Sequence, residues 1–382
     1  MYNRLLKTPG KIGSSFFLFG PRGTGKTTWL RQQFSKPDCV FLDMLNDDLY
    51  TELLAAPHRL ESLISKSSIT WIVIDEIQRV PALLNEVHRL IEDRKIKFAM
   101  TGSSARSLRK RGVNLLAGRA LTYHMHPMTA VEQGAAFDMQ RAILHGQLPA
   151  IETHPSPAKY LKSYVTTYLR EEIQQEGLTR NIGNFTRFLE TASFSQGSAL
   201  NIAEVARESA LNRNVVDAYF SIIEDLLIAK RLPVFTKRAR RRLVAHPKFY
   251  YFDAGVYRAI RPAGPLDTPE EADGACVETL CLQELWAINE YFGLDYKIYY
   301  WRTSDGTEVD FVLYGSAGLL AFEIKRSKTC SPRDLNGLKA FRKDYPMAKC
   351  YLLYGGEHIR EADGIRILPM EQALKTLPDL LK

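Results

Sequence analysis

The stretch that most constrains this chain is FFLFGPRGTGKTT, residues 16–28. Four apolar residues with the pattern of a buried strand precede a segment that fills every position of GxxxxGK[ST], and an amphipathic helical pattern follows. Glycines there let backbone amides close around polyphosphate, a lysine reaches the β- and γ-phosphates, and a hydroxyl at the helix start holds Mg²⁺. The pattern predicts a phosphate-binding loop for ATP and Mg²⁺, with Lys26 also catalytic and Thr27 a metal ligand. The expected binding residues are Gly20, Pro21, Arg22, Gly23, Thr24, Gly25, Lys26, Thr27 and Thr28.

A second acidic motif completes the expected nucleotide site. Four apolar residues, Trp71 to Ile74, predict a buried strand that ends in Asp75 and Glu76. At the end of such a strand, Asp75 can hold the water shell of the Mg²⁺ ion, and Glu76 can polarise the water that attacks the γ-phosphate. Many strands end in two surface acids, but the loop upstream favours the functional interpretation.

A further predicted strand ends in hydroxyl groups. Pro81 is expected to open an amphipathic helix, and the strand pattern KFAMTGSS, residues 97–104, follows it. Thr101 is the candidate polar sensor of the γ-phosphate, with Ser103 as the second choice. Capping of the next helix by Ser103 or Ser104 explains the hydroxyls equally well.

Length, charge and cysteine content limit the class of protein. The chain has 382 residues, so two or three domains are expected. Its net charge is +8, and the eight Lys and Arg residues between Leu226 and Phe252, a span without acids, account for that excess and favour a polyanionic partner. Five scattered cysteines without CxxC spacing are not typical of a disulfide framework or a zinc site. Because no secretory-type apolar core and no run of about 18 apolar residues occurs, the sequence predicts a cytoplasmic protein without a membrane partner.

The N-terminal motifs resemble the AAA+ ATPases, in the version whose additional strand lies between the two nucleotide-binding motifs. The resemblance covers roughly residues 1–150, with a domain boundary expected near residue 155, and implies a parallel α/β P-loop domain that hydrolyses ATP. The segment LLAGRA, residues 115–120, occupies the place where such proteins carry a charge-stabilising arginine. Arg119 is therefore a candidate catalytic residue, in its own site or in that of a neighbouring subunit of a homo-oligomer. A plain surface arginine is the alternative.

A small helical domain is expected over residues 156–252. Helical patterns at residues 203–206 and 216–227 flank a predicted turn, and residues 232–235 and 248–252 are predicted to pair as a β-hairpin. This order resembles a winged helix, so DNA is the favoured partner. The residues expected to contact its phosphates are Arg213, Lys237, Arg238, Arg240, Arg241 and Arg242. A solvated loop and a protein-binding winged helix are the alternatives.

The last third, residues 253–382, carries acids on predicted neighbouring elements. Glu278 lies on a helix expected over residues 273–291, and strands are expected over 296–301, 307–313 and 319–325. If residues 315–318 form a four-residue hairpin loop, Asp310 lies opposite Glu323, and both share one face with Lys325. Two facing carboxylates need a cation, so either Lys325 neutralises them or Mg²⁺ or Mn²⁺ lies between them.

This set of residues resembles the PD-(D/E)xK nucleases, which have the restriction-endonuclease-like α/β fold. The resemblance implies that Glu278, Asp310 and Glu323 hold the metal ion. It also implies that Asp310, Glu323 and Lys325 are catalytic, with Lys325 orienting or activating the attacking water. No proline precedes Asp310, in contrast to the family pattern. Structural salt bridges between the same residues are the alternative.

The order of all three parts resembles a large prokaryotic group of poorly characterised ATPases. The main hypothesis is an Mg²⁺-dependent ATPase that couples its nucleotide state to DNA binding and to metal-dependent phosphodiester cleavage. The second is an ATP-switched regulatory module that binds DNA or protein and keeps the nuclease-like fold as a non-cutting scaffold. The third gives the C-terminal domain a role in assembly only.

Overall fold

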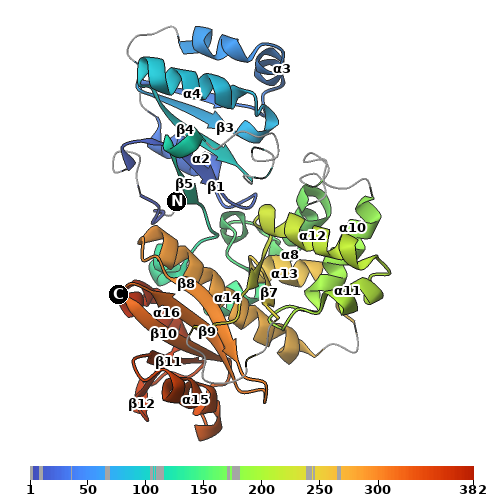
Figure 1. Ribbon diagram of the computed structural model, residues 1–382, viewed down its shortest axis with the longest axis vertical. Coiled ribbons are helices and arrows are strands. Elements are labelled where there is room, and N and C mark those ends of the chain that lie inside the picture. The colour runs from blue at the N-terminus through green and yellow to red at the C-terminus, as the bar shows by residue number, and fades with distance from the viewer. Residues whose placement is uncertain are drawn as a thin grey trace. The chain divides into compact units, whose positions relative to one another are not determined.

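The computed structural model describes residues 3–7, 12–35, 37–64, 69–103, 106, 108, 116–169, 173, 181–237, 243, 246–264 and 268–382 (Figure 1). The chain forms two compact units. The P-loop unit comprises Arg4–His126 and Asp225–Leu227, and the C-terminal unit comprises Met1–Asn3, Pro127–Glu224 and Ile228–Lys382. The predicted boundaries near residues 155 and 252 stay predictions.

The P-loop unit contains a five-stranded parallel sheet among its described residues, in the order β2-β3-β4-β1-β5. Its strands are β1 (Ser15–Phe19), β2 (Cys39–Asp43), β3 (Trp71–Asp75), β4 (Lys97–Gly102) and β5 (Ala120–His124). Because β4 lies between β1 and β3, an additional strand separates the two nucleotide-binding motifs, as expected. Every residue of β1 is buried, which explains its continuous apolar run.

Helices pack against this parallel sheet (Figure 1). They are α2 (Lys26–Gln33), α3 (Asp47–Ala55) and α4 (Leu83–Arg94), with 3₁₀ turns at Pro57–Ile64, Ile77–Arg79 and Leu116–Gly118. The apolar face of α4 buries Leu83, Leu84, Val87 and Leu90 in the cluster that also contains Ile72 and Ile74 of β3. The face that the 3.6-residue period of apolar residues predicts for this helix is therefore the face that packs against the sheet.

The C-terminal unit is built on a six-stranded mixed sheet in the order β12-β13-β11-β10-β9-β8. Its strands are β8 (Lys297–Arg302), β9 (Glu308–Gly315), β10 (Gly318–Lys325), β11 (Lys349–Tyr354), β12 (Arg360–Ala362) and β13 (Ile365–Pro369). The helix α15 (Asn336–Asp344) covers a hydrophobic cluster that includes Phe341, Val309 and Val312. The long helix α14 (Pro269–Tyr291) also packs beside this sheet (Figure 1). The α/β class is confirmed, whereas the restriction-endonuclease-like assignment stays a prediction.

Shorter helices make up most of the rest of this unit. They are α6 (Ala130–Gln133), α7 (Met139–His145), α8 (Pro157–Ser163), a π-helix at Tyr164–Leu169, α10 (Ile182–Ser193), α11 (Ile202–Glu208), α12 (Arg213–Asp225), α13 (Ala254–Ile260), α16 (Met370–Lys375) and α17 (Leu377–Leu381). Further 3₁₀ turns lie at Gly134–Ala136, Pro149–Glu152 and Pro332–Leu335. None of the described helices has the length and apolar character that crossing a bilayer requires.

One strand of the predicted hairpin is displaced. The described pair is β6 (Ala229–Leu232) with β7 (Lys248–Tyr251), antiparallel, and it follows the helices α11 and α12 as expected. The expected first strand at residues 232–235 is wrong except for Leu232. Phe235 instead donates its amide to the carbonyl of Tyr300 in β8 at 2.7 Å, because Pro233 cannot donate to a continuing ladder. The winged-helix assignment stays a prediction.

Candidate functional site

The loop after β1 has a backbone that only glycine fits at two positions. Gly25 is left-handed, with φ 92° and ψ 20°, and precedes the first residue of α2. A Cβ atom at Gly20 would lie 2.3 Å from the backbone carbonyl oxygen of Met125. Arg4 stabilises the loop, because its guanidinium donates hydrogen bonds to the carbonyl oxygens of Thr24 at 2.8 Å and His126 at 2.6 Å. The predicted loop is therefore a closed turn at the N-terminus of α2.

Lys26 lies where a phosphate-binding lysine is expected. Its ammonium group donates to the carbonyl oxygen of Gly20 at 2.7 Å and to that of Pro21 at 3.2 Å. The side chain thus folds back over its own loop and is 94% removed from solvent, with a relative exposure of 6%. Thr24 is fully buried and donates its hydroxyl to Pro21 at 2.9 Å, so it supports the turn, whereas Thr28 is exposed.

Thr101 joins the two acids of the second motif. Its hydroxyl donates to Oδ1 of Asp75 and accepts the backbone amide of Glu76 at 3.0 Å. β3 and β4 are adjacent parallel strands, so the end of β4 lies beside the end of β3. The predicted sensor position is therefore occupied by a fully buried hydroxyl that holds the Asp75 carboxylate and the backbone of Glu76.

Gln78 is a residue of this site that the sequence patterns did not single out. Its side-chain amide donates to Oε2 of Glu76 and lies 3.4 Å from the hydroxyl of Ser103. Glu76 itself has a left-handed backbone, with φ 60° and ψ 47°, an unfavourable conformation for a non-glycine residue. The proximity of Gln78 to Glu76 in the sequence was the available signal, but a turn at Glu76 was needed to bring the two together.

The chemistry of Asp75 fits a cation. Burial raises the pKa of Asp75, while hydrogen bonds from Thr101 and Thr27 lower it. Its Oδ2 atom is buried and has no hydrogen-bond partner among the described residues. An orphaned carboxylate oxygen next to the Thr27 hydroxyl is the donor set that Mg²⁺ prefers, so Thr27 and Asp75 could hold that ion.

Arg119 lies on the surface of the P-loop unit. Its guanidinium pairs with the carboxylate of Glu92 on α4, and the two side chains are 38% and 46% exposed. This contact matches the alternative interpretation, a plain surface arginine. Action on a nucleotide, in the same or another subunit, stays a prediction.

A β-bulge changes the geometry expected for the C-terminal acids. The turn between β9 and β10 has the predicted register, with Phe311 opposite Phe322, although its loop is only Ser316 and Ala317. Along the other edge of β9, Val312 lies opposite Tyr299 of β8 and Val309 lies opposite Trp301. Three steps along β9 therefore match two steps along β8, which leaves one extra residue in β9. Asp310 lies in this bulge.

The expectation that Asp310, Glu323 and Lys325 share one face is wrong. Val309 and Val312 both belong to the cluster under α15, so the residues between them point to the opposite side of the sheet. Leu319 and Ala321 belong to that same cluster, and Glu323 and Lys325 follow them at every second position of β10, so all four side chains share that face. The bulge therefore divides the predicted set into Asp310 with Glu278 on one side and Glu323 with Lys325 on the other.

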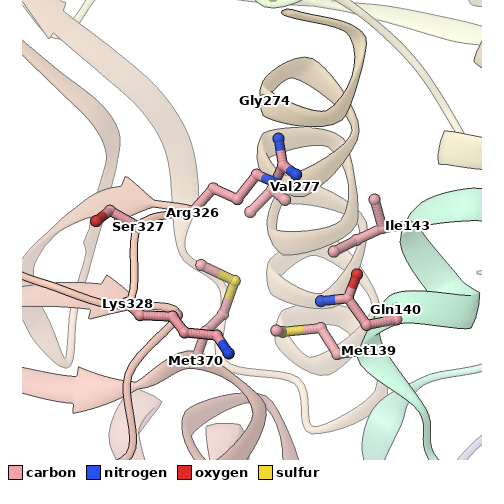
Figure 2. A pocket seen from close by; sticks show the side chains of 10 residues that line it. Met139, Gln140, Ile143, Gly274, Val277, Arg326, Ser327, Lys328 and Met370 are labelled. Atoms are coloured by element: carbon pink, nitrogen blue, oxygen red, sulfur yellow. The ribbon is translucent and has the colours of Figure 1, made fainter. Parts of the chain in front are cut away.

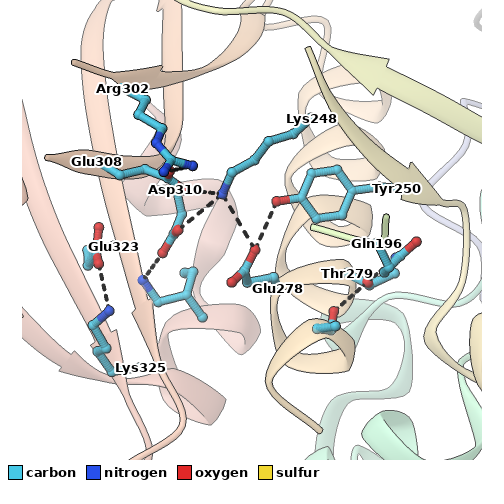
Figure 3. A network of polar contacts seen from close by, with 12 residues as sticks. Gln196, Lys248, Tyr250, Glu278, Thr279, Arg302, Glu308, Asp310, Glu323 and Lys325 are labelled. Atoms are coloured by element: carbon cyan, nitrogen blue, oxygen red, sulfur yellow. Dashed lines mark hydrogen bonds and ion pairs between the residues drawn. The ribbon is translucent and has the colours of Figure 1, made fainter. Parts of the chain in front are cut away.

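A buried lysine lies among the acids on the first side. The ammonium of Lys248, from β7, lies 3.8 Å from Glu278 and 3.6 Å from Asp310, and it also pairs with Glu308 (Figure 3). We call Lys248, Glu278, Glu308 and Asp310 the lysine-centred cluster. In the sequence, Lys248 is only part of the basic excess, because nothing local marks its contact with residues 30 to 62 positions away.

Hydrogen bonds fix the acids around this lysine. Asp310 Oδ2 accepts the amide of Ile324 at 2.9 Å, and Glu278 Oε2 accepts the hydroxyl of Tyr250 at 2.9 Å (Figure 3). Burial and repulsion from Asp310 raise the pKa of Glu278 to about 7, against attraction to Lys248. Although burial opposes its charge, attraction to Tyr250 and the three carboxylates raises the pKa of Lys248.

The second group is an ion pair. Lys325 lies 2.8 Å from Glu323, and burial followed by repulsion from Asp310 raises the pKa of Glu323 to about 8. Among the described residues, no three or more His, Cys, Asp and Glu side chains are arranged to hold a metal ion. The expected metal set of Glu278, Asp310 and Glu323 therefore does not fit a divalent ion in this arrangement, because Lys248 occupies the space between the carboxylates and the bulge separates Glu323.

The predicted phosphate-contacting residues are only partly described. Arg213 is exposed at the first position of α12, and Lys237 is exposed, with its carbonyl accepting the hydroxyl of Tyr345 at 3.0 Å. The remaining members, Arg238, Arg240, Arg241 and Arg242, lie outside the described residues.

A cavity of about 600 Å³ lies in the C-terminal unit beside the carboxyl ends of β10 and β11. Arg326, Ser327 and Lys328 line one wall, and Met139 and Ile143 of α7 line another (Figure 2). Arg326 is paired with Asp273 of α14 at 2.9 Å.

Comparison with known families divides the chain into three segments. Residues 13–133 match a family described as an AAA domain. Residues 136–267 and 273–373 match two families described as domains of unknown function, DUF8612 and DUF4143. The P-loop unit is thus an α/β P-loop domain by motif and by strand order, and it is similar to the AAA domain family, which suggests nucleotide binding.

Two similar curated proteins are themselves uncharacterized. Proteins of Mycobacterium tuberculosis and Mycobacterium bovis are each 27% identical over 370 residues, which covers 94% of this chain and 80% of theirs. The structure of the replication initiator DnaA bound to AMPPCP and single-stranded DNA matches with a TM-score of 0.29 and 11% identity, over 55% of this chain and 82% of that one. The Orc1 protein of Aeropyrum pernix in complex with DNA matches with a TM-score of 0.24 and 15% identity, over 65% and 86%. Scores this low do not establish a shared overall fold.

Proposed function

We propose that this chain binds ATP with Mg²⁺ at the loop of residues 20–28 and hydrolyses it. The observation that carries the proposal is the contact between the two motifs. Thr27, next to the loop lysine, hydrogen-bonds to Asp75, and Thr101 joins Asp75 to the backbone of Glu76. Lys26 is held over the same loop by two carbonyls. Lys26 would leave the loop carbonyls for the phosphates. Bound Mg²⁺ would neutralise phosphate charge, and Thr27 and Asp75 would hold it.

Glu76 is proposed to orient and polarise the attacking water. Glu76 directly follows Asp75, so one turn supplies both the proposed Mg²⁺ ligand and the carboxylate proposed to orient the water. Gln78 donates its side-chain amide to the Glu76 carboxylate. Hydrolysis therefore requires that Glu76 exchange this amide for water.

Two substitutions test the ATPase proposal on the full chain. Lys26→Ala should abolish ATP turnover and weaken ATP binding, and Glu76→Gln should keep binding while turnover falls by about 10²- to 10⁴-fold. Glu52→Gln is the matched control, because Glu52 is a half-exposed acid on α3. Turnover that is unchanged in both Lys26→Ala and Glu76→Gln would contradict the proposal.

For the C-terminal unit we propose a non-cutting, regulatory role in binding DNA or protein. The specific observation that favours it is the ammonium of Lys248 among the acids that would otherwise hold a metal ion. Metal-dependent phosphodiester cleavage is the competing outcome. A nuclease assay with Mg²⁺ and Mn²⁺ separates the two: cleavage that is lost in Asp310→Ala would overturn the regulatory proposal.

DNA is the proposed polyanionic partner, with Arg213 and Lys237 among the contact residues. Each phosphate contact steepens the fall of affinity with salt. Removing the charge in Arg213→Ala should therefore weaken DNA binding and make it less salt-dependent by about one phosphate contact. Arg187→Ala on α10 is a control at another exposed arginine. Binding that is indifferent to salt would remove these residues from the proposed interface.

A further inference from the structure

The lysine-centred cluster has the composition of a cation site. Three carboxylates come from two elements, Glu278 from α14 and Glu308 and Asp310 from β9, and they face one point. Hard oxygen donors that converge in this way are the ligands of Mg²⁺ and Mn²⁺. The point is occupied by the Lys248 ammonium, whose side chain is only 3% exposed (Figure 3).

The charges of the cluster are nearly balanced by side chains alone. Arg302 pairs with Glu308 at 3.3 Å, so two cations face the three carboxyl groups of the cluster. Without Lys248, the acids would repel one another in a partly buried site. The ammonium therefore performs the electrostatic task that a metal ion performs in a cluster of acids.

The cluster is also reachable from solvent. Glu278 and Glu308 are 26% and 24% exposed, and Asp310 is 10% exposed. The distances of 3.6 and 3.8 Å from the ammonium are longer than the 2.0–2.6 Å typical of oxygen ligands to Mg²⁺ and Ca²⁺, so an ion would have to draw the acids inward.

We propose that Lys248 replaces a divalent cation in this cluster, so that the natural protein holds no metal there and loss of the ammonium creates a metal site. The proposal concerns the C-terminal unit alone and does not depend on the ATPase proposal. The site created by loss of the ammonium would bind a divalent cation that prefers oxygen ligands, and Mn²⁺ is the probe for it.

The test is a Mn²⁺ titration of the full chain without nucleotide, followed by electron paramagnetic resonance of the free ion. Lys248→Met keeps the length of the side chain and removes its charge, and it should gain one Mn²⁺ equivalent over the natural protein. The double variant Lys248→Met with Asp310→Asn should lose that equivalent. Both variants keep Thr27 and Asp75, so binding at the nucleotide site cancels in the comparison.

Thermal unfolding supplies a second readout. Lys248→Met should melt below the natural protein, and Mn²⁺ should raise its midpoint more than it raises that of the double variant or of Lys248→Arg. A folded Lys248→Met protein that gains no Mn²⁺ would overturn the proposal. If Lys248→Met does not fold, the natural protein still tests the proposal. Mn²⁺ binding by the natural protein that is lost in Asp310→Asn would contradict it.

Discussion

At the scale of single residues, one hydroxyl organises the proposed nucleotide site. Thr101 donates to Asp75 and accepts from the amide of Glu76, so the proposed metal acid and the proposed catalytic acid share one partner. A serine could make both bonds, whereas valine has the shape of threonine but no hydroxyl. The site therefore offers a direct test of whether orientation of the acids matters for turnover.

Thr101→Val should lower the turnover number for ATP by at least about tenfold while ATP affinity changes much less, because the loop that binds the phosphates is untouched. It should also destabilise the P-loop unit by about 1–3 kcal/mol, since a buried amide and a buried carboxylate lose their partner. Steady-state kinetics and ATP titration check the first effect, and urea unfolding checks the second. Thr101→Ser should restore most of both, and an equally inactive serine variant would argue against this role.

At the scale of elements, local sequence patterns predicted most of the buried strands but fewer of the site residues that distant segments bring together. The alternation and run lengths predicted β1, β3, β4, β9 and β10, because these strands depend on burial of their own side chains. The loop and Asp75 came from a motif whose spacing is local. Gln78 and Lys248 were missed because a left-handed turn and a contact between β7 and β9 bring them to their sites. The bulge at Asp310 was missed because a register computed from the hairpin turn assumes an unbroken strand.

The helix α14 carries a second buried acid that links it to the segment around α6 and α7. Glu284 is fully buried and accepts the amide of Ala130 at 2.8 Å and the side-chain amide of Gln147 at 3.1 Å. Burial raises its pKa to about 8, against the hydrogen bonds that lower it. At neutral pH the folded protein therefore keeps a proton on Glu284 that the unfolded chain has lost.

This difference makes the C-terminal unit less stable as pH rises from about 5 to 8, because the folded state binds more protons than the unfolded state throughout that window. Glu284→Gln removes the titration while keeping an oxygen acceptor, so its melting temperature should fall less over the same range. Glu278 and Glu323, whose pKa values are raised to about 7 and about 8, titrate in both proteins and cancel in the comparison. Melting temperatures that fall equally with pH in the two proteins would contradict a raised pKa of Glu284.

At the scale of the whole molecule, the chain divides into two compact units, of which only the P-loop unit carries the proposed ATP site. A ligand stabilises the part it binds by mass action, by about 2.7 kcal/mol at a concentration one hundred times its dissociation constant. Calorimetry with ATP and Mg²⁺ should therefore raise one unfolding transition and leave the other in place. Lys26→Ala should abolish the shift, and equal movement of both transitions would show that the units unfold together.

Arg4 has a practical consequence for anyone producing this protein. A single side chain near the start of the chain ties the carbonyl of Thr24 to that of His126, so the geometry of the loop depends on residues far outside its motif. Loss of the first four residues would remove both contacts of Arg4, loosen the turn and weaken the proposed binding of ATP. An affinity tag placed there needs a spacer that leaves Arg4 in position.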